Sequence, residues 1–112
     1  DMYNIENKME LDALPPEAEE SEECVCVRIR LPNGIRCQRR FHFSASMEEV
    51  MLWTYHECMK HRQTHLVNHC QLVSTHPRTV YDEMEKNLKE LKFWRPNAKR
   101  MLASHLLFVE EL

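Results

Sequence analysis

The residues best suited to bind a metal lie close together in the middle of the sequence. Histidine and cysteine are common zinc ligands, and six of them fall within fifteen residues: His56, Cys58, His61, His65, His69 and Cys70. On a helix, Cys58, His61 and His65 would share one face. Yet the group contains no Cys-x-x-Cys pair, and Cys58 also belongs to an apolar helical stripe. We therefore expect no metal and no cofactor, and keep a small zinc-stabilised domain as an alternative that metal analysis would test.

A second group with binding chemistry is a row of arginines around a turn. Arg28 and Arg30 precede Pro32-Asn33-Gly34, and Arg36 and Arg40 follow it. Such a row could bind a phosphate backbone, but the acidic start of the chain and the lack of aromatic residues between these arginines argue against nucleic acid. A guanidinium also suits the carboxylates and carbonyls of a protein partner. For the arginines other than Arg30, a solvated sheet face is the alternative interpretation.

No catalytic constellation is visible in the sequence. An enzyme needs a nucleophile with a base, a pair of carboxylates or a loop that holds phosphate. This chain has scattered acids and a single glycine, Gly34. We therefore predict a non-catalytic binding module.

Alternation of apolar and polar residues predicts two strands joined by a turn. The apolar residues of the first strand face a core, while its cysteines and arginines form a wet face. The inward set is Val25, Val27, Ile29 and Leu31, and the outward set is Cys24, Cys26, Arg28 and Arg30. Asn33-Gly34 supplies the positive φ angles of a tight hairpin. The return strand points Ile35, Cys37, Phe41 and Phe43 inward, and Arg39 interrupts this face near an expected sheet edge.

A capping box at Ser46-Met47-Glu48-Glu49 predicts the start of an amphipathic helix that runs to about Lys60. Its apolar face contains Met47, Val50, Met51, Thr54 and Cys58. Residues 69–75 then predict a third strand that ends before Pro77, and residues 79–81 a short fourth strand.

Towards the end of the chain, residues 88–93 and 96–104 favour short helical turns, and residues 105–110 favour a terminal strand. The resulting order of elements predicts an α+β fold. Specifically, it predicts a ubiquitin-like β-grasp, in which a mixed sheet packs on one main helix.

Charge divides the chain into two parts. Residues 1–23 contain nine acids and one lysine, a net charge of −8, which leaves +5 for residues 24–112 because the whole chain carries −3. Two prolines and dense negative charge in residues 14–23 favour a linker. We therefore predict an acidic linker, or the end of an upstream element, over residues 1–23, followed by one domain over residues 24–112. The chain looks like a fragment of a longer protein.

The cysteines and the hydropathy bear on location. An odd number of cysteines, five, with no framework spacing and no secretory signal, favours free thiols in the cytoplasm, the nucleus or both. No apolar run is long enough to span a bilayer, so no membrane contact is expected.

Several motifs in a fixed order resemble those of UBX domains, with the Fas-associated-factor branch closest around residues 39–44. They are Val27-Arg-Ile-Arg-Leu-Pro-Asn-Gly34, Gln38-Arg-Arg-Phe41, Leu72-Val-Ser-Thr-His-Pro-Arg78, Asn87-Leu-Lys-Glu-Leu91 and Leu106-Leu-Phe-Val-Glu110. The resemblance covers roughly residues 24–112. Because single motifs of this kind are common, their order is what makes the resemblance specific.

The resemblance implies an adaptor that docks on the N-terminal domain of the hexameric AAA ATPase valosin-containing protein and links it to ubiquitinated substrates. UBX domains make this contact with an arginine of the first strand and a Phe-Pro-Arg turn between the third and fourth strands. The matching residues are Arg30 and the turn His76, Pro77 and Arg78, and Arg28 joins them as a neighbour on the same wet face.

The chain departs from the family pattern at three places. The turn phenylalanine is His76 here, and the segments near residues 60–68 and 94–104 are longer than usual. An alternative hypothesis is therefore a divergent ubiquitin-like scaffold that has lost ATPase binding. The chain also ends in Glu110-Glu111-Leu112 rather than the diglycine of a conjugated modifier.

Overall fold

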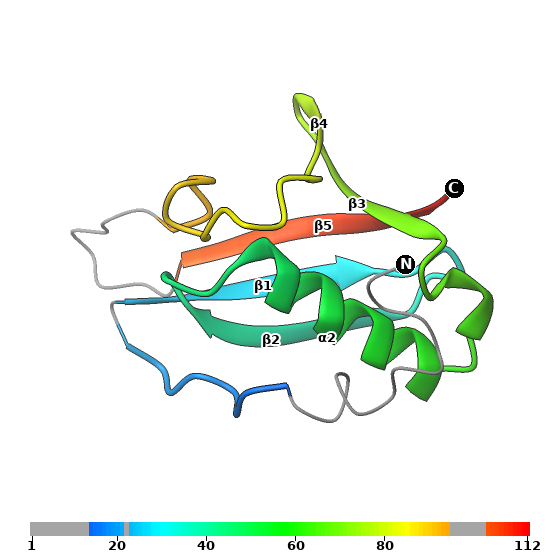
Figure 1. Ribbon diagram of the computed structural model, residues 1–112, viewed down its shortest axis with the longest axis horizontal. Helices are drawn as coiled ribbons and strands as arrows, with labels where there is room; N and C mark the ends of the chain where they lie inside the picture. Colours follow the sequence, from blue (N-terminus) through cyan, green and yellow to red (C-terminus); the bar gives the residue numbers. More distant parts are fainter. Residues whose placement is uncertain (1–13, 22, 95–102) are drawn as a thin grey trace.

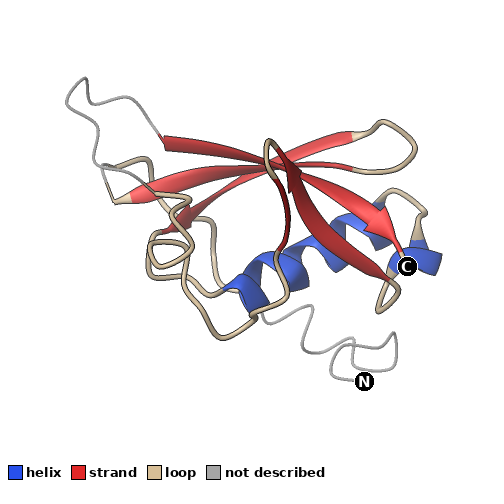
Figure 2. Ribbon diagram, turned by 90° about the horizontal axis from the view of Figure 1, so that it is seen from above, coloured by secondary structure: helices blue, strands red, loops and turns tan. Residues whose placement is uncertain are grey.

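The computed structural model describes residues 14–21, 23–94 and 103–112 of the chain. Within these residues, one five-stranded sheet packs against a single long helix that crosses one of its faces (Figures 1 and 2). The strands are β1 (Cys24–Arg30), β2 (Arg36–His42), β3 (Cys70–Thr75), β4 (Arg78–Val80) and β5 (Ala103–Glu111). The helices are α2 (Met47–Lys60) and the short 3-10 helix η2 (Thr64–Leu66). The predicted ubiquitin-like β-grasp is confirmed.

The sheet is mixed, in the order β2-β1-β5-β3-β4. The central pair, β1 and β5, is parallel, and the other three pairs are antiparallel. Throughout the article the inner face is the one that α2 covers, and the outer face is the opposite one. Because directly paired residues point to the same face, the register assigns every strand residue to one of the two.

The β1–β2 hairpin differs in one detail from the sequence prediction. Gly34 has a φ of 90°, whereas Asn33 does not have a positive φ. The Gly34 amide donates to the Leu31 carbonyl at 2.9 Å, and the Asn33 side-chain oxygen accepts from the Ile35 amide at 3.1 Å. The turn therefore needs one left-handed residue rather than two, and glycine occupies that position.

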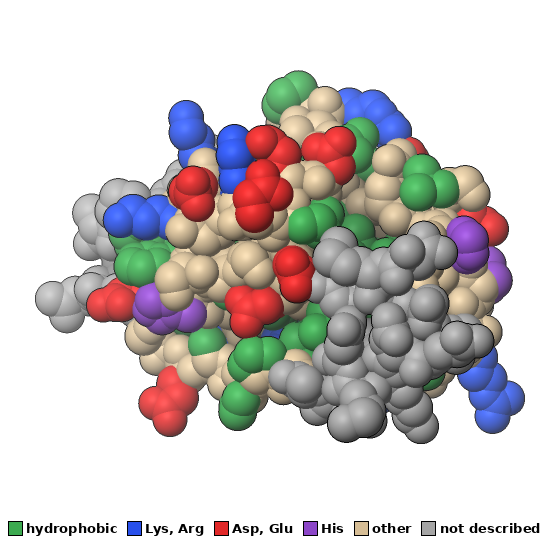
Figure 3. Space-filling model, in the orientation of Figure 1, with side chains coloured by type: hydrophobic (Ala, Val, Ile, Leu, Met, Phe, Trp, Pro, Cys, Tyr) green, Lys and Arg blue, Asp and Glu red, His purple; other side chains and the backbone are tan. Residues whose placement is uncertain are grey.

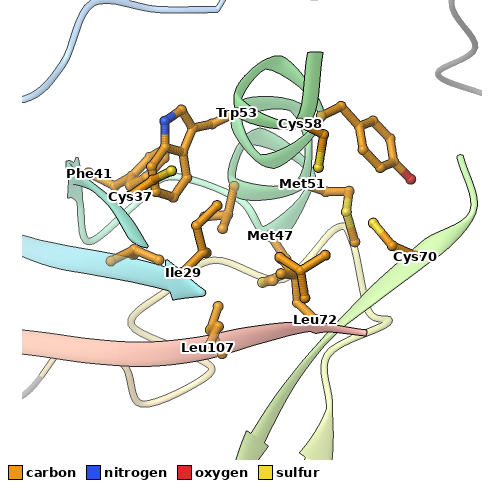
Figure 4. Close-up of a cluster of buried hydrophobic side chains, with 14 of the residues drawn as sticks. Ile29, Cys37, Phe41, Met47, Met51, Trp53, Cys58, Cys70, Leu72 and Leu107 are labelled. Carbon is orange, nitrogen blue, oxygen red and sulfur yellow. The ribbon is translucent and has the colours of Figure 1, made fainter. Parts of the chain in front are cut away.

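The predicted capping box is present at the start of α2. The Glu49 amide donates to the Ser46 hydroxyl at 3.3 Å, and the Ser46 amide donates to the Glu49 carboxylate at 3.0 Å. All five residues of the predicted apolar face are buried, and the helix ends at Lys60 as expected. Figure 4 shows how this face meets the sheet, with Met47 near Leu72 and Leu107, and Trp53 beside Phe41.

The prediction that Cys24 and Cys26 lie on a wet face is wrong, because the two side chains are 1% and 9% exposed. The chain just before β1 turns back over this end of the strand. The Cys24 thiol donates to the Ser21 carbonyl at 3.2 Å, and its sulfur accepts from the Ser21 amide. Along β1, side chains on the outer face are exposed to solvent only from Arg28 onward.

The acidic segment before β1 lies along the free edge of β2. The Ala18 amide donates to the Arg40 carbonyl at 3.2 Å, and the Arg40 amide donates to the Glu17 carboxylate at 3.0 Å. The Arg39 guanidinium donates to the Pro15 carbonyl. Arg39 lies on an edge strand, as predicted. The segment thus covers part of an exposed sheet edge, although its composition is typical of a linker.

Of the two segments that the sequence comparison found to be longer than usual, the structure describes the first in full. Residues 61–69 carry η2 and bury Leu66 and Val67 in the core.

The expected turn near residue 90 is hydrogen-bonded from the Leu91 amide to the Asn87 carbonyl at 3.0 Å. Most of the predicted helical turn at 96–104 lies outside the described residues, and its last two residues belong to β5 instead, which begins at Ala103.

No helix in the described part of the chain combines the length and the apolar character needed to cross a bilayer.

Candidate functional site

The outer face of the sheet brings the predicted docking residues of β1 together with residues of the four other strands. Arg30 pairs with Arg36 on β2 and with Phe108 on β5. Phe108 pairs in turn with Val73 on β3, which pairs with Val80 on β4. One continuous row of side chains therefore crosses the whole outer face and begins with two arginines. Arg28 lies in the next row, opposite Leu106.

Arg28 and Arg30 are exposed, and neither makes an ion pair or a side-chain hydrogen bond with any residue that the structure describes. Arg30 on β1 and Arg36 on β2 occupy directly paired positions. Like charges in such positions destabilise a sheet. A hollow of about 480 Å³ lies among Arg28, Arg30, Arg36 and Leu106. An anionic group bound here would offset the repulsion between the arginines.

Two exposed apolar side chains lie beside this row and at its far end. Leu106, in the next row on β5, is 41% exposed, and Val80, on the edge strand β4, is 37% exposed. Phe108 lies between them and is half-buried. Since a buried, largely apolar centre with a polar rim is typical of protein interfaces, this row suits a protein partner.

The predicted turn residues lie at the tip of the β3–β4 hairpin, which projects from the rest of the molecule (Figure 1). The His76-Pro77 peptide bond is cis, and both residues are exposed. The hydroxyls of Ser74 and Thr79 donate to the Pro77 carbonyl, each at 3.3 Å. Two hydroxyl groups therefore fix the turn from its two flanking strands and leave the His76 side chain accessible.

Arg78 belongs to a hydrogen-bonded group at the base of this turn. Its guanidinium donates two bonds to the Glu110 carboxylate, at 2.9 and 2.6 Å, and the Gln71 amide donates to the same carboxylate at 2.7 Å. The hydrogen bonds from Arg78 and Gln71 lower the pKa of Glu110 to about 2. Arg78 is thus held in one orientation, in contrast to Arg28 and Arg30.

Opposite charges gather on the other side of the molecule. Figure 3 shows acidic side chains grouped on the side that α2 covers. The segment after β4 supplies four exposed acids (Asp82, Glu83, Glu85 and Glu90) and three lysines (Lys86, Lys89 and Lys92), and α2 adds Glu48, Glu49 and Glu57 against Lys60, so this side is net negative. The positive outer face and the acidic helix side give the domain a charge asymmetry that would orient an acidic partner towards the arginines.

The helical face that was considered as an alternative zinc site is not assembled. Cys58 is fully buried among core residues, and burial raises its pKa to about 11. His65 belongs to η2 rather than α2, and its Nε2 lies 4.0 Å from the Glu111 carboxylate. Cys58, His61 and His65 therefore do not converge on one point, because the helix ends before the third of them.

Sequence reasoning placed the arginines and the turn on exposed positions but missed the rest of the surface. Leu106 and Phe108 were hidden in the run Leu106-Leu-Phe-Val109, which is typical of a strand buried on both faces. Only every second residue of that run, Leu107 and Val109, faces the core. The contact between Glu110 and Arg78 left no signal in the sequence, because it depends on the pairing of β5 with β3.

Comparison with known proteins agrees with this geometry. The family description that matches the chain is "UBX domain", over residues 19–98. A similar solved structure is the solution structure of the UBX domain of D0H8S2298E protein, with 27% sequence identity and a TM-score of 0.58. The match covers 88% of this chain and 80% of that chain. A search of curated protein sequences found no significant match.

Proposed function

The chain belongs to the UBX family, and from that premise we propose that it docks its outer sheet face on the N-terminal domain of the AAA ATPase valosin-containing protein. UBX domains are ubiquitin-like and generally non-catalytic protein-interaction modules. In this proposal Arg30, with Arg28 beside it, contacts acidic or carbonyl groups of the ATPase. The turn His76, Pro77 and Arg78 contacts a neighbouring pocket, and the apolar row between them closes against the partner.

The observation that carries the proposal is the pair Arg30 and Arg36. Two exposed guanidinium groups lie opposite each other, and neither has an acidic partner in the described residues. Folding gains nothing from that arrangement, whereas a partner with carboxylates or free carbonyls would gain charge-assisted hydrogen bonds. Arginine is also among the residues most enriched at binding hot spots.

His76 weakens this docking without preventing it. A phenylalanine at the tip of the turn would fill an apolar pocket, and an imidazole there buries less apolar surface and must lose water from its ring nitrogens. Such a change costs on the order of 1–3 kcal/mol. The hydrogen bonds from Arg78 to Glu110 keep the ordering cost of binding low, since this side chain does not have to be immobilised on docking.

Calorimetry with the isolated N-terminal domain of valosin-containing protein tests the proposal. We expect micromolar binding by the native chain. Arg30→Ala should lose about 2 kcal/mol or more, and His76→Phe should bind more tightly. Lys60→Ala is the matched control, because it removes an exposed positive charge from α2, away from the outer face. Equal losses in Arg30→Ala and Lys60→Ala would reduce the interaction to non-specific attraction and contradict the proposal.

His76 also favours a second candidate function. In this alternative the domain is a ubiquitin-like scaffold that keeps the fold but has lost the ATPase contact. Native protein that does not bind, together with a His76→Phe variant that does, would establish this alternative. Absence of binding in the native chain and in the His76→Phe variant would exclude ATPase docking altogether.

The wider role extends the same proposal. A docked domain would link the ATPase to ubiquitinated substrates chosen by other parts of the protein, in the cytoplasm or the nucleus. All five cysteines are buried as free thiols, as a reducing compartment requires. Co-purification of the ATPase from a cell extract, lost with Arg30→Ala, would support this role.

A further inference from the structure

Side chains one helical turn apart on α2 face the inner side of β2. Trp53 packs edge-on against Phe41, with ring centroids 5.6 Å apart (Figure 4). One turn later the Glu57 carboxylate lies within 4.8 Å of the Cys37 sulfur of β2 and raises the pKa of that thiol. One further turn brings His61, the C-terminal cap of the helix, next to Glu57, with Nε2 3.9 Å from Oε1. The cysteine sulfur, a carboxylate oxygen and an imidazole nitrogen all lie within 4.8 Å of one another.

We propose that Cys37, Glu57 and His61 bind a single zinc ion between β2 and the C-terminal end of α2. The inference is independent of ATPase docking, because all three side chains approach from the inner side of β2. The site differs from the set of Cys58, His61 and His65 that spacing along the helix suggested. Cys37 of β2 takes the place of Cys58, and Glu57 takes the place of His65.

The donor set selects zinc over the hard divalent cations. Sulfur, imidazole nitrogen and carboxylate oxygen are the ligands that zinc prefers, whereas calcium and magnesium take oxygen ligands almost exclusively. Three protein ligands leave the fourth tetrahedral position to water. The site is open enough for an ion to enter, since the side chains of His61 and Glu57 are 30% and 13% exposed.

Zinc binding requires only a small movement of the three side chains. Zinc bonds of about 2.0–2.3 Å hold the ligand atoms of a tetrahedron roughly 3.5 Å apart. The present spacing of at most 4.8 Å must therefore shrink by about 1 Å. Glu57 and His61 are both partly exposed, so their side chains can rotate towards Cys37 without disturbing the core.

The Glu57 carboxylate beside Cys37 favours a cation at this site. Burial and Glu57 also raise the pKa of Cys37 to about 12, so the thiol is neutral without a metal and the loss of its proton weakens zinc binding. When zinc binds, the Cys37 S–H bond breaks, the sulfur bonds to the metal and the proton leaves to water. The ion then balances one thiolate and one carboxylate, with His61 as a neutral ligand. The partial negative charge at the C-terminal end of α2 adds to this preference.

Two cations oppose the ion and limit its affinity. Lys60 belongs to the same helical turn and lowers the pKa of Cys37. Arg39 approaches from β2 and interacts with Glu57. Because Lys60 is exposed, its charge is screened by solvent. Removing it with Lys60→Ala should tighten zinc binding.

Cobalt is the probe for this site, because a thiolate bound to Co²⁺ produces a charge-transfer absorption band that imidazole and carboxylate ligands do not. Titration of the whole chain with Co²⁺ should develop this band up to one equivalent, and added Zn²⁺ should abolish it. Calorimetry in buffers of different ionisation enthalpy should detect one proton released for each zinc bound. A native chain without the band has at most an adventitious ion, and the proposal is then wrong.

Matched variants locate the site. Cys37→Ser should abolish the band, and His61→Gln should weaken cobalt binding at least tenfold. Cys26→Ser and His65→Gln are the controls: Cys26 is as buried as Cys37, and His65 lies just beyond the site. Both should bind as the native chain does. A band that survives His61→Gln and Glu57→Gln unchanged would overturn the proposal. These two variants decide the matter even if circular dichroism shows that Cys37→Ser does not fold.

Discussion

The two faces of the sheet are built from the same strands but differ in how deeply their side chains are buried. On β5, Leu107 and Val109 are almost completely buried on the inner face, while Leu106 on the outer face is 41% exposed. On β1, Ile29 is fully buried, whereas its neighbour Arg30 is exposed. The apolar composition of the inner face follows from the need to bury apolar surface against α2. The outer face also buries Cys24, Cys26 and Val73, but it exposes charged and apolar side chains such as Arg30 and Leu106 that folding does not require.

The proposed docking accounts for this difference between the two faces. An isolated domain would gain stability from polar, uncharged residues at positions such as Arg30 and Arg36, because like charges in directly paired positions repel each other. It would also gain solubility from a polar residue in place of Leu106. A partner that covers this face would offset the repulsion between the arginines and bury Leu106.

The comparison can be tested most strongly with two adjacent leucines of β5. Leu107→Ala should lower the free energy of unfolding by about 2–5 kcal/mol, because it removes core packing and leaves a cavity. Leu106→Ala should change it by less than about 1 kcal/mol but should weaken ATPase docking. Urea unfolding and calorimetry measure the two effects. Similar losses of stability in both variants would contradict the assignment of the two faces.

A smaller effect concerns the helix that covers the inner face. Ser46→Ala removes the hydroxyl that caps α2 and should cost about 1 kcal/mol of unfolding free energy. Ser44→Ala is the control, since Ser44 bonds to the exposed His42 ring outside the helix. ATPase docking by Ser46→Ala should match that of the native chain at temperatures where both are folded. A specific docking defect would show that the two faces are coupled.

The smallest effect belongs to Glu110 on the outer face. Its pKa lies near 2 in the folded protein, below the ordinary 4.5, because Arg78 and Gln71 bond to the charged form. A lowered pKa contributes stability that is fully present above pH 4.5 and is lost as the pH falls towards 2. Over that interval, Glu110→Gln should lose less stability than the native chain.

Urea midpoints measured across the same pH interval check this prediction, and Glu111→Gln is the control because Glu111 does not contact Arg78. A native chain and a Glu110→Gln variant with parallel pH profiles would show that the group formed by Arg78, Glu110 and Gln71 is broken in solution.

Local patterns were sufficient to predict most of the elements. Alternation located β1 and β2, the capping box located the start of α2, and Pro77 located the turn between β3 and β4. These features depend on neighbours in sequence, such as the Ser46 hydroxyl and the Glu49 amide. The same locality explains why Arg28, Arg30, His76 and Arg78 were correctly expected to be exposed.

Features that depend on distant parts of the chain could not be predicted in the same way. Cys24 is buried because the chain before it folds back, and Glu110 meets Arg78 only through the pairing of β3 with β5. The metal-binding group proposed above joins Cys37 of a strand to two residues of a helix, so no spacing along the sequence reveals it. In each case the missing information is a tertiary contact.

The parallel pairing of β1 with β5 has a consequence for how the domain folds. The first strand, β1, pairs with β2 on one edge and with the last strand, β5, on the other, so its two hydrogen-bonded edges are filled by segments from opposite ends of the domain. Contacts of such long sequence separation slow folding, because a large loop must close before they form. On the ribosome, β1 and β2 emerge early as a hairpin with one side unpaired. The sheet can close only after β5 has been synthesised and has left the ribosome.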